Sequence, residues 1–369
     1  MMSASSNLHE EILFQTSKAN FSRAIDANGK VIYLETSLHE NPSLDDLLAI
    51  KNDFEITHSL QCKGVLRSHE LIIRPKGLTI VKNYFDGIPL SNYLQQSTIS
   101  LSSALEIMLQ LSNIVTELHA KKIIHKDLNP ENILISEDGK KLEICYFGIA
   151  TQLAQETQGI RLNESLKATL THISPEQTGR MNRSIDYRSD LYSLGVLFYQ
   201  LVCGKMPFAY QDVLELIHAH IARYPTEPHL VNETIPKPIS DIIMKLLAKN
   251  AEDRYQSAHG LVRDIDYCLQ QYNTNKQISS FTIADFDYST TLNITEKLYG
   301  RKTEIERLTK AFEESKFLPP ELILVCGYSG IGKTRLIHEI DKPVSANHGY
   351  FISGKFDQFH ADKPYSALR

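Results

Sequence analysis

Five short motifs, in a fixed order along the chain, constrain its fold more than its composition does. They are His125-Lys126-Asp127-Leu128-Asn129-Pro130-Glu131-Asn132, Tyr146-Phe147-Gly148, Ser174-Pro175-Glu176, Asp190-Leu191-Tyr192-Ser193-Leu194-Gly195 and Glu252-Asp253-Arg254-Tyr255. One motif of this length arises easily by chance, whereas five in order do not. An unrelated helical domain with a chance His-Lys-Asp is therefore the weaker interpretation.

The order and content of these motifs resemble those of protein kinases, over residues 12–272. The first motif is similar to the kinase catalytic loop, which implies that Asp127 accepts the proton of a substrate hydroxyl and that Asn132 is a possible magnesium ligand. ATP and Mg²⁺ are the cofactors that the resemblance implies. Lys126 and Asn129 differ from the residues common in kinases, but the pattern His-Lys-Asp-x-Asn-Pro is similar to that of a bacterial subgroup.

The other motifs imply a structural frame around the catalytic loop. By resemblance, His125 is a core residue that braces the loop backbone, and Asp190 braces it from a buried helix. Glu176 and Arg254 are expected to form a buried ion pair, which is costly to break from one side.

Hydrophobic patterning predicts two lobes. In residues 12–90, the turn signal Asp26-Ala27-Asn28-Gly29, a helical pattern from Pro42 to Leu60 and two later strand-like runs predict a small, strand-rich lobe. From Ser100 onward, apolar residues recur at helical spacing, which predicts a larger helical lobe over residues 91–272. The expected fold is therefore the α+β bilobal fold of protein kinases.

The nucleotide side of the small lobe departs from the kinase pattern at three places. Residues 14–22, where a kinase has its phosphate-covering loop, contain no glycine. Glu35 stands where a lysine would contact the phosphates, and its expected partner on the next helix is Asp53. Tyr146 replaces the aspartate that would hold Mg²⁺, and a neutral phenol is a poor ligand for that ion.

These departures predict a Ser/Thr kinase-like signalling module that uses Mg-ATP poorly, a pseudokinase that acts as a regulatory or binding domain. Glu35 and Asp53 should repel both each other and a triphosphate, because like charges a few ångströms apart are unfavourable by several kcal/mol. The alternative is an active Ser/Thr protein kinase in which another lysine replaces the lost one, with Lys18 or Lys30 as candidates. A structure that places Lys18, Lys30 or Lys82 within reach of the phosphate position would support it.

A second nucleotide motif lies near the end of the chain. The apolar run at residues 322–326, expected to be a strand, leads into Gly327-Tyr328-Ser329-Gly330-Ile331-Gly332-Lys333-Thr334. In such a P-loop the backbone N–H groups near Gly327, Gly330 and Gly332 cradle phosphates, Lys333 reaches the β and γ phosphates, and the Thr334 hydroxyl is a possible magnesium ligand. The motif and the residues after it resemble those of AAA or STAND-type ATPases.

We expect this ATPase domain, residues 298–369, to be incomplete. A doubly wound nucleotide domain needs further strands, one of which carries the second metal carboxylate, and none follows the P-loop in this sequence. The chain is expected to be a fragment, a truncated product or the N-terminal part of a large signalling kinase, a class that often ends in a histidine kinase. The P-loop should bind nucleotide only in a complete domain.

Composition argues against several other classes. A net charge of −5 provides no basic footprint for nucleic acid, and the five scattered cysteines are typical of reduced thiols. Residues 1–11 are polar and predicted to be disordered, and no stretch approaches a membrane span. We therefore expect a cytoplasmic protein whose partners are proteins or downstream signalling domains, with residues 273–297 as a linker.

Overall fold

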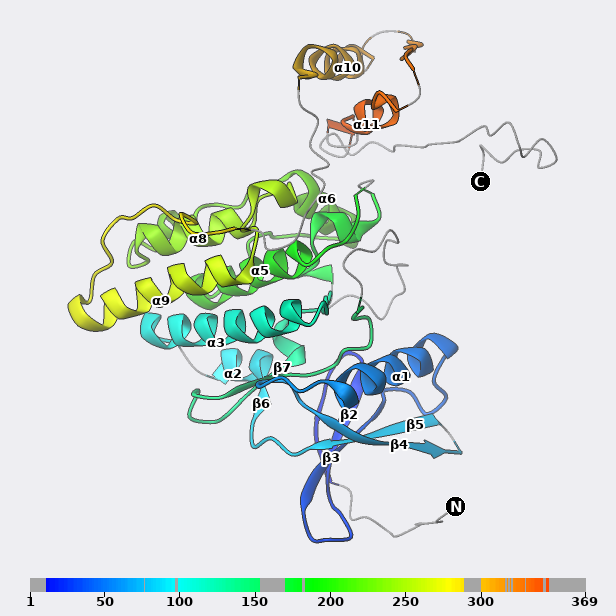
Figure 1. The fold of residues 1–369 in the computed structure, drawn as a ribbon, viewed down its shortest axis with the longest axis vertical. Coiled ribbons are helices and arrows are strands. Elements are labelled where there is room, and N and C mark those ends of the chain that lie inside the picture. The colour runs from blue at the N-terminus through cyan, green and yellow to red at the C-terminus, as the bar shows by residue number, and fades with distance from the viewer. Residues whose placement is uncertain are drawn as a thin grey trace, which may run out of the picture.

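Five antiparallel strands form the sheet of the N-terminal lobe (Figure 1). The computed structural model describes residues 11–75, 77–96, 99–152, 170–180, 183–288 and 300–315, together with 317, 319, 321–328, 330–340 and 343–344. In spatial order the strands are β1 (Glu11–Gln15), β2 (Ala19–Ile25), β3 (Val31–Ser37), β5 (Gly77–Asn83) and β4 (Ser68–Arg74).

The β2–β3 hairpin forms where the turn signal predicts it. Asp26 Oδ1 accepts hydrogen bonds from the backbone N–H groups of Asn28 and Lys30, both at 2.8 Å, and Gly29 has a φ of 79°. Glycine adopts that conformation without steric cost. The turn sets the strand register, and Glu35 consequently pairs with Phe21 on one side and with Ile80 on the other.

Helix α1 (Leu44–Ser59) packs against this sheet. Its first turn is closed by a capping box, in which Ser43 Oγ accepts from the Asp46 N–H at 3.2 Å and Asp46 Oδ2 accepts from the Ser43 N–H at 3.0 Å. The buried face of the helix carries Ile50 and also the carboxyl group of Asp53. A buried carboxylate needs a partner, which the structure provides from the sheet.

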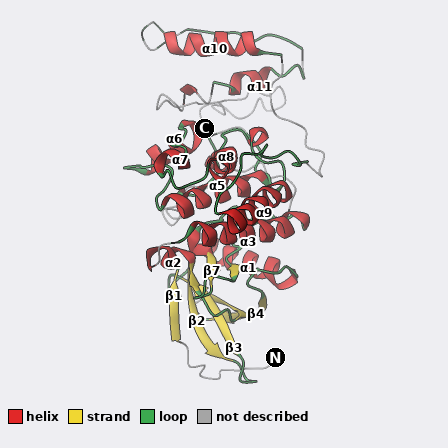
Figure 2. Cartoon of the chain, turned by 90° about the vertical axis from the view of Figure 1, so that its left-hand side faces the viewer, coloured by secondary structure: helices red, strands yellow, loops and turns green. Residues whose placement is uncertain are grey.

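The C-terminal lobe is mainly helical (Figure 2). Its helices are α2 (Leu90–Gln96), α3 (Leu101–Ala120), α5 (Arg188–Cys203), α6 (Val213–Ala222), α7 (Pro228–Val231), α8 (Lys237–Leu246) and α9 (Ala258–Asn275). Short strands β6 (Ile88–Pro89), β7 (Ile133–Ile135) and β8 (Leu142–Ile144) form a second antiparallel sheet, and 3-10 helices lie at Pro130–Asn132, Pro175–Thr178 and Ala251–Asp253. Helix α3 packs against α5 and α9 around one large apolar core. The predicted bilobal α+β fold is confirmed.

Two predicted boundaries, at the N-terminus and at the linker, can be compared with the described residues. Strand β1 begins at Glu11, and the disorder predicted for the N-terminus concerns residues 1–10, which are outside the described residues. The linker at 273–297 stays a prediction. Within it, α9 continues to Asn275, and Phe281, Ile283 and Ala284 pack against the C-lobe core. Residues 289–299 are again outside the description.

The ATPase portion contains helices α10 (Lys302–Glu314) and α11 (Lys333–His338). The strand predicted at residues 322–326 is absent, since residues 321–328 are described without regular secondary structure. Leu322 and Leu324 are 85% and 77% exposed, which indicates the reason: a strand forms only when neighbours complete its hydrogen-bond ladder.

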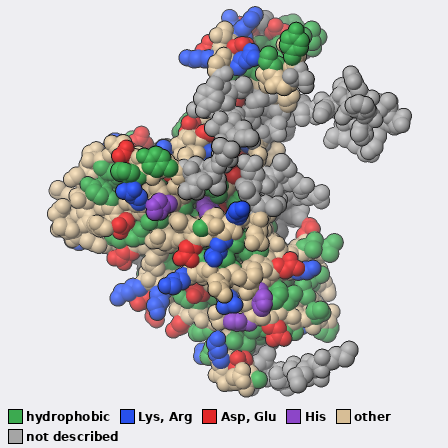
Figure 3. Space-filling view, viewed as in Figure 1, with side chains coloured by type: hydrophobic (Ala, Val, Ile, Leu, Met, Phe, Trp, Pro, Cys, Tyr) green, Lys and Arg blue, Asp and Glu red, His purple; other side chains and the backbone are tan. Residues whose placement is uncertain are grey.

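On the face of the molecule drawn in Figure 3, neither sign of charge dominates among the described residues. Basic and acidic side chains of these residues are interspersed over both lobes. Within the described parts of the chain, no helix combines the length and apolar character that a membrane crossing requires.

Candidate functional site

The catalytic-loop residues Asp127 and Asn132 lie together between α3 and β7. Asn132 Nδ2 donates to the backbone oxygen and to Oδ2 of Asp127, both at 2.9 Å, and Asn129 Nδ2 donates to Asp127 Oδ1 at 2.8 Å. The Asp127 carboxylate is thus oriented by two amides and is only 3% exposed. This arrangement fixes the orientation of a nearly buried carboxylate.

Asp190 braces the loop backbone, as the resemblance implies. Its carboxylate accepts hydrogen bonds from the N–H groups of His125 (2.9 Å) and Lys126 (2.8 Å), which holds Lys126 at a φ of 64°. It also lies 2.9 Å from Nε2 of His119, a contact that the sequence analysis missed. Burial would raise the pKa of Asp190, but the hydrogen bonds from His119 and from the loop lower it. Asp190 therefore stays ionised at the centre of this frame.

His125 is part of the core rather than a titrating group. Its ring stacks edge-on against Phe147, with 4.5 Å between centroids, and its Nδ1 accepts from the Asp127 N–H at 3.2 Å. Complete burial lowers its pKa, which favours the neutral imidazole. The side chain consequently holds the loop through packing and one hydrogen bond.

Glu176 and Arg254 form a two-pronged ion pair. Arg254 Nη1 lies 2.7 Å from Glu176 Oε1, and Nη2 lies 2.9 Å from Oε2; Ser189 Oγ donates to Oε1 at 2.7 Å. Burial opposes ionisation, yet the guanidinium and these hydrogen bonds lower the pKa of Glu176 to about 2. One buried negative charge is matched by one buried positive charge.

The expectation that Glu35 and Asp53 face each other without a cation is wrong. The charge of Asp53 still raises the pKa of Glu35, but a lysine is paired with both acids. Lys82, from β5, lies between them: its Nζ is 3.0 and 2.9 Å from the two oxygens of Asp53 and 2.6 Å from Glu35 Oε2. All three side chains are completely buried. We call Glu35, Asp53 and Lys82 the buried triad.

The strand register explains why Lys82 reaches this position. Glu35 pairs with Ile80 across β3 and β5, so Lys82, two residues farther along β5, points to the same face. Thr57 of α1 completes the surroundings by donating to Asp53 Oδ1 at 3.2 Å. A lysine on the neighbouring strand therefore occupies the space expected for a lysine on β3.

The charges of the buried triad do not balance when both acids are ionised. Burial raises the pKa of Glu35 to about 7, although Lys82 pulls it downward, and neither Glu35 oxygen has a hydrogen bond of good geometry. Burial opposes the charge of Lys82, but Asp53 and Glu35 together raise its pKa. With a proton on Glu35 the group is neutral, which is the favourable state for three completely buried side chains.

Lys18 reaches the catalytic loop from the turn between β1 and β2. Its Nζ forms an ion pair with Asp127 Oδ2 and lies 5.0 Å from the ring centroid of Tyr146. The adjacent Ser17 N–H donates to Glu131 Oε2 at 3.0 Å, so this turn is docked on the catalytic loop. Lys30, in contrast, is exposed and donates to Asn83 at 3.4 Å on the outside of the sheet.

Tyr146 fills space beside the catalytic aspartate. It has a φ of 60°, and an added Cβ at Gly148 would lie 2.9 Å from its ring, so the next glycine allows this close packing. Burial, followed by the charge of Asp127, raises the pKa of the phenol well above its usual value. Tyr146 is thus a neutral, buried side chain at the position where the resemblance implies a metal carboxylate.

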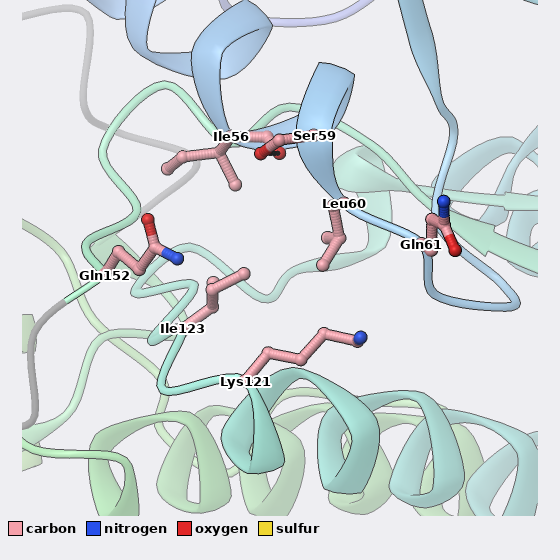
Figure 4. Close-up of a pocket in the computed structure, with 7 residues that line it drawn as sticks. All are labelled: Ile56, Ser59, Leu60, Gln61, Lys121, Ile123 and Gln152. Atoms are coloured by element: carbon pink, nitrogen blue, oxygen red, sulfur yellow. Dashed lines mark hydrogen bonds between the residues drawn. The ribbon is translucent and has the colours of Figure 1, made fainter.

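A pocket of about 310 Å³ lies at the C-terminal end of α1 (Figure 4), and Asp127 is not among the residues that line it. Its lining residues are Ile56, Ser59, Leu60, Gln61, Lys121, Ile123 and Gln152. In the described parts of the chain, no group of three or more His, Cys, Asp or Glu side chains is arranged to hold a metal.

The P-loop residues are partly arranged as the motif predicts. Gly330 and Gly332 have φ values of 84° and 91°, and α11 begins at Lys333. Lys333 Nζ donates to the backbone oxygens of Gly327 and Tyr328, both at 2.8 Å, and Thr334 is exposed. The lysine therefore closes the loop on itself instead of pointing away from it.

Comparison with known proteins agrees with this organisation. A protein kinase domain model matches residues 23–264, and an AAA ATPase domain model matches residues 297–369. The chain is 30% identical to a hybrid signal transduction histidine kinase of Dictyostelium discoideum, over 76% of this chain and 11% of that protein. It is 31% identical to a probable serine/threonine-protein kinase of Clostridium perfringens (57% and 30%) and 30% identical to the serine/threonine-protein kinase PknB of Mycobacterium tuberculosis (50% and 29%).

The chain thus spans less than a third of the length of each of these relatives. Proteins with kinase and AAA domains typically bind ATP and Mg²⁺. Since the kinase model covers most of the two lobes and the described fold has the same architecture, this chain belongs to the protein kinase family, with an AAA ATPase domain adjoining its kinase domain.

Proposed function

We propose that the kinase-like domain is a pseudokinase: a signalling module that regulates or binds the adjoining ATPase and transfers phosphate poorly or not at all. The buried triad carries this proposal. The ammonium group of Lys82 is already paired with two carboxylates and is completely buried. A triphosphate would have to displace those carboxylates and enter a site with no net positive charge.

The residues around Asp127 also fit a magnesium ion poorly. Mg²⁺ is usually bound by carboxylates and phosphates together with water, in an octahedral arrangement. Asn132 offers an amide oxygen while its Nδ2 donates to Asp127, and Tyr146 offers a phenol whose pKa is raised. The cofactor implied by the family thus lacks its second protein ligand beside Asp127.

The second candidate function is an active Ser/Thr protein kinase with a rearranged nucleotide site. One observation favours it: Lys18 is paired with Asp127, so a lysine is present beside the catalytic loop. Its ammonium group is free to contact phosphate only if the ion pair with Asp127 opens. Lys30 gives no such support, because it lies outside the sheet.

Thermal unfolding with and without Mg-ATP distinguishes the pseudokinase from the active kinase. The 369-residue chain is measured with the Lys333→Ala substitution, which disables the P-loop. The pseudokinase predicts no magnesium-dependent stabilisation and no phosphate incorporation above an Asp127→Asn control. Stabilisation combined with incorporation that depends on Asp127 would overturn it. If Lys18→Met then abolishes both signals while Lys30→Met leaves them intact, the active-kinase candidate is supported.

We further propose that Lys333 and Thr334 serve a working ATPase site when the domain is complete, in a larger signalling protein of the kind these relatives represent. The support is the match of the AAA model to residues 297–369. Nucleotide retention by a longer natural chain, compared with its Lys333→Ala variant, tests this. Equal retention by both would contradict it.

A further inference from the structure

Residues 281–288, which we call the exit segment, follow helix α9 and fold back onto it. The ring of Phe281 lies 4.7 Å from that of Tyr267 on α9, edge to face, and the Arg263 guanidinium lies over the ring of Phe286 at 4.1 Å. Phe281, with Ile283 beside it, packs against the main core. The exit segment is thus the last described part of the chain before the ATPase portion, and it is attached to the C-lobe.

Asp287 makes the central polar contact of this segment. Its Oδ1 accepts from Ser257 Oγ at 2.7 Å, and its Oδ2 accepts from the Gln256 N–H. Ser257 is also the N-cap of α9, since its Oγ accepts from the Gly260 N–H at 3.0 Å. The carboxylate therefore lies at the helix N-terminus, where a negative charge is favourable.

Gly260 leaves room for this carboxylate. A Cβ at position 260 would lie 2.5 Å from Asp287 Oδ1, 2.7 Å from Asp287 Cβ and 2.8 Å from Cγ. Any side chain at position 260 would collide with the docked aspartate. A glycine within a helix costs about 1 kcal/mol relative to alanine, so its presence here indicates a packing role.

A second hydrogen bond holds a strained residue of the segment. Ala284 has a φ of 59°, a conformation that non-glycine residues adopt rarely, and its N–H donates to Asp264 Oδ2 at 2.7 Å. Its carbonyl accepts from the Asp287 N–H at 3.2 Å, which closes a turn. The same Asp264 oxygen accepts from Tyr255 OH at 2.5 Å. The positive φ of Ala284 is thus accompanied by a hydrogen bond to α9 and by one within the segment.

We propose that the exit segment is an intramolecular strap, docked through Asp287 in a carboxylate site formed by Gln256, Ser257 and Gly260. The site adjoins the frame of the catalytic loop, because Gln256 Oε1 accepts from Arg188 Nη1 at 2.9 Å and Arg254 lies two residues earlier. The strap ties the chain that leads to the ATPase to the C-lobe. A role of the strap in coupling the kinase-like domain to the ATPase rests on the proposed regulatory function. The docking of the strap does not depend on that function.

Amide hydrogen exchange of the 369-residue chain tests the docking. Asp287→Ala and Gly260→Ala are expected to speed exchange at the Ala284 and Asp287 amides by about tenfold or more, the effect of losing a hydrogen bond to a charged group. Asp285→Ala is the matched control, because Asp285 is an exposed acid in the same segment, and it should change these rates by less than about twofold. Equal exchange in Asp287→Ala and Asp285→Ala would overturn the proposal.

Gly260→Ala provides a readout that general destabilisation does not imitate. Since alanine favours the helix, protection within α9 should be unchanged or higher while protection of the exit segment falls. If Gly260→Ala also speeds amide exchange in α3, the docking is judged from Asp287→Ala alone, because that substitution removes no core group. Neither outcome depends on nucleotide, so magnesium-dependent ATP binding would overturn the pseudokinase proposal and leave the strap unaffected.

Discussion

The ion pair Glu176–Arg254 and the buried triad are equally buried, yet they behave in opposite ways. In the C-lobe one carboxylate meets one guanidinium, and the pKa of Glu176 falls to about 2. In the N-lobe two carboxylates share one ammonium, and the pKa of Glu35 rises to about 7. Burial raises the pKa of both acids, so the balance of charge around each decides the direction.

This contrast separates the frame of the catalytic loop from the nucleotide side of the N-lobe. The C-lobe pair supports the platform of the catalytic loop, and its charges match the resemblance to kinases residue by residue. The buried triad links α1 to β3 and β5 with no nucleotide needed. The elements of the N-lobe are therefore held to one another by their own side chains.

Breaking the C-lobe pair should have the largest effect. Arg254→Met leaves Glu176 buried without a counter-charge and should lower the free energy of unfolding by about 3–5 kcal/mol in urea titrations at pH 7. Because the pKa of Glu176 is depressed, this stabilisation is present above pH 4.5 and is lost as the pH falls towards 2. Lys237→Met, from an exposed pair with Asp241, is the control and should have little effect. Equal losses in the two variants would contradict the prediction.

Removing Lys82 should have a smaller effect that depends on pH. Lys82→Met leaves Glu35 and Asp53 together, at an expected cost of about 3 kcal/mol at pH 8. The cost should be smaller at pH 5, where Glu35 can accept a proton. Unfolding of Lys30→Met, a lysine exposed on the same lobe, provides the comparison. A loss that is the same at both pH values would show that Glu35 does not titrate in the folded protein.

Neutralising Glu35 should be mildly stabilising at high pH. Its raised pKa means that its contribution is fully present below pH 4.5 and is lost as the pH rises through about 7. Glu35→Gln cannot ionise, so the free energy of unfolding no longer falls as the pH rises. The substitution should stabilise the protein at pH 8 by on the order of 1 kcal/mol, with no gain at pH 4.5. Burial also raises the pKa of Glu143 to about 7, so Glu143→Gln must be measured in parallel.

Restoring one carboxylate should have the smallest effect. Tyr146→Asp, in the Lys333→Ala background, returns a hard oxygen ligand but leaves the buried triad and the glycine-free turn in place. We expect Mg-ATP to shift the unfolding temperature by less than about 1 °C. A shift above about 3 °C would mean that Tyr146 alone blocks Mg-ATP binding.

Several site features were predictable because their signals are local or belong to an ordered set of motifs. The β2–β3 hairpin follows from Asp26 and Gly29, and the arrangement of Asp127 with Asn132 follows from one short loop. The strand expected at residues 322–326 was wrong, since an apolar run becomes a strand only when neighbours pair with it. The polar residues at the end of α9 resemble a connector, so the sequence did not indicate that the helix continues to Asn275.

The sequence by itself determined the bilobal fold and the identity of the Glu176–Arg254 pair, through motif order and apolar periodicity. Only the tertiary structure decided that Lys82 lies between Glu35 and Asp53, that Lys18 reaches Asp127 across 109 residues, and that Asp287 docks on α9. The physical reason is that a buried charge is partnered by whatever the strand register and chain path bring within a few ångströms, and separation in sequence carries little information about that distance.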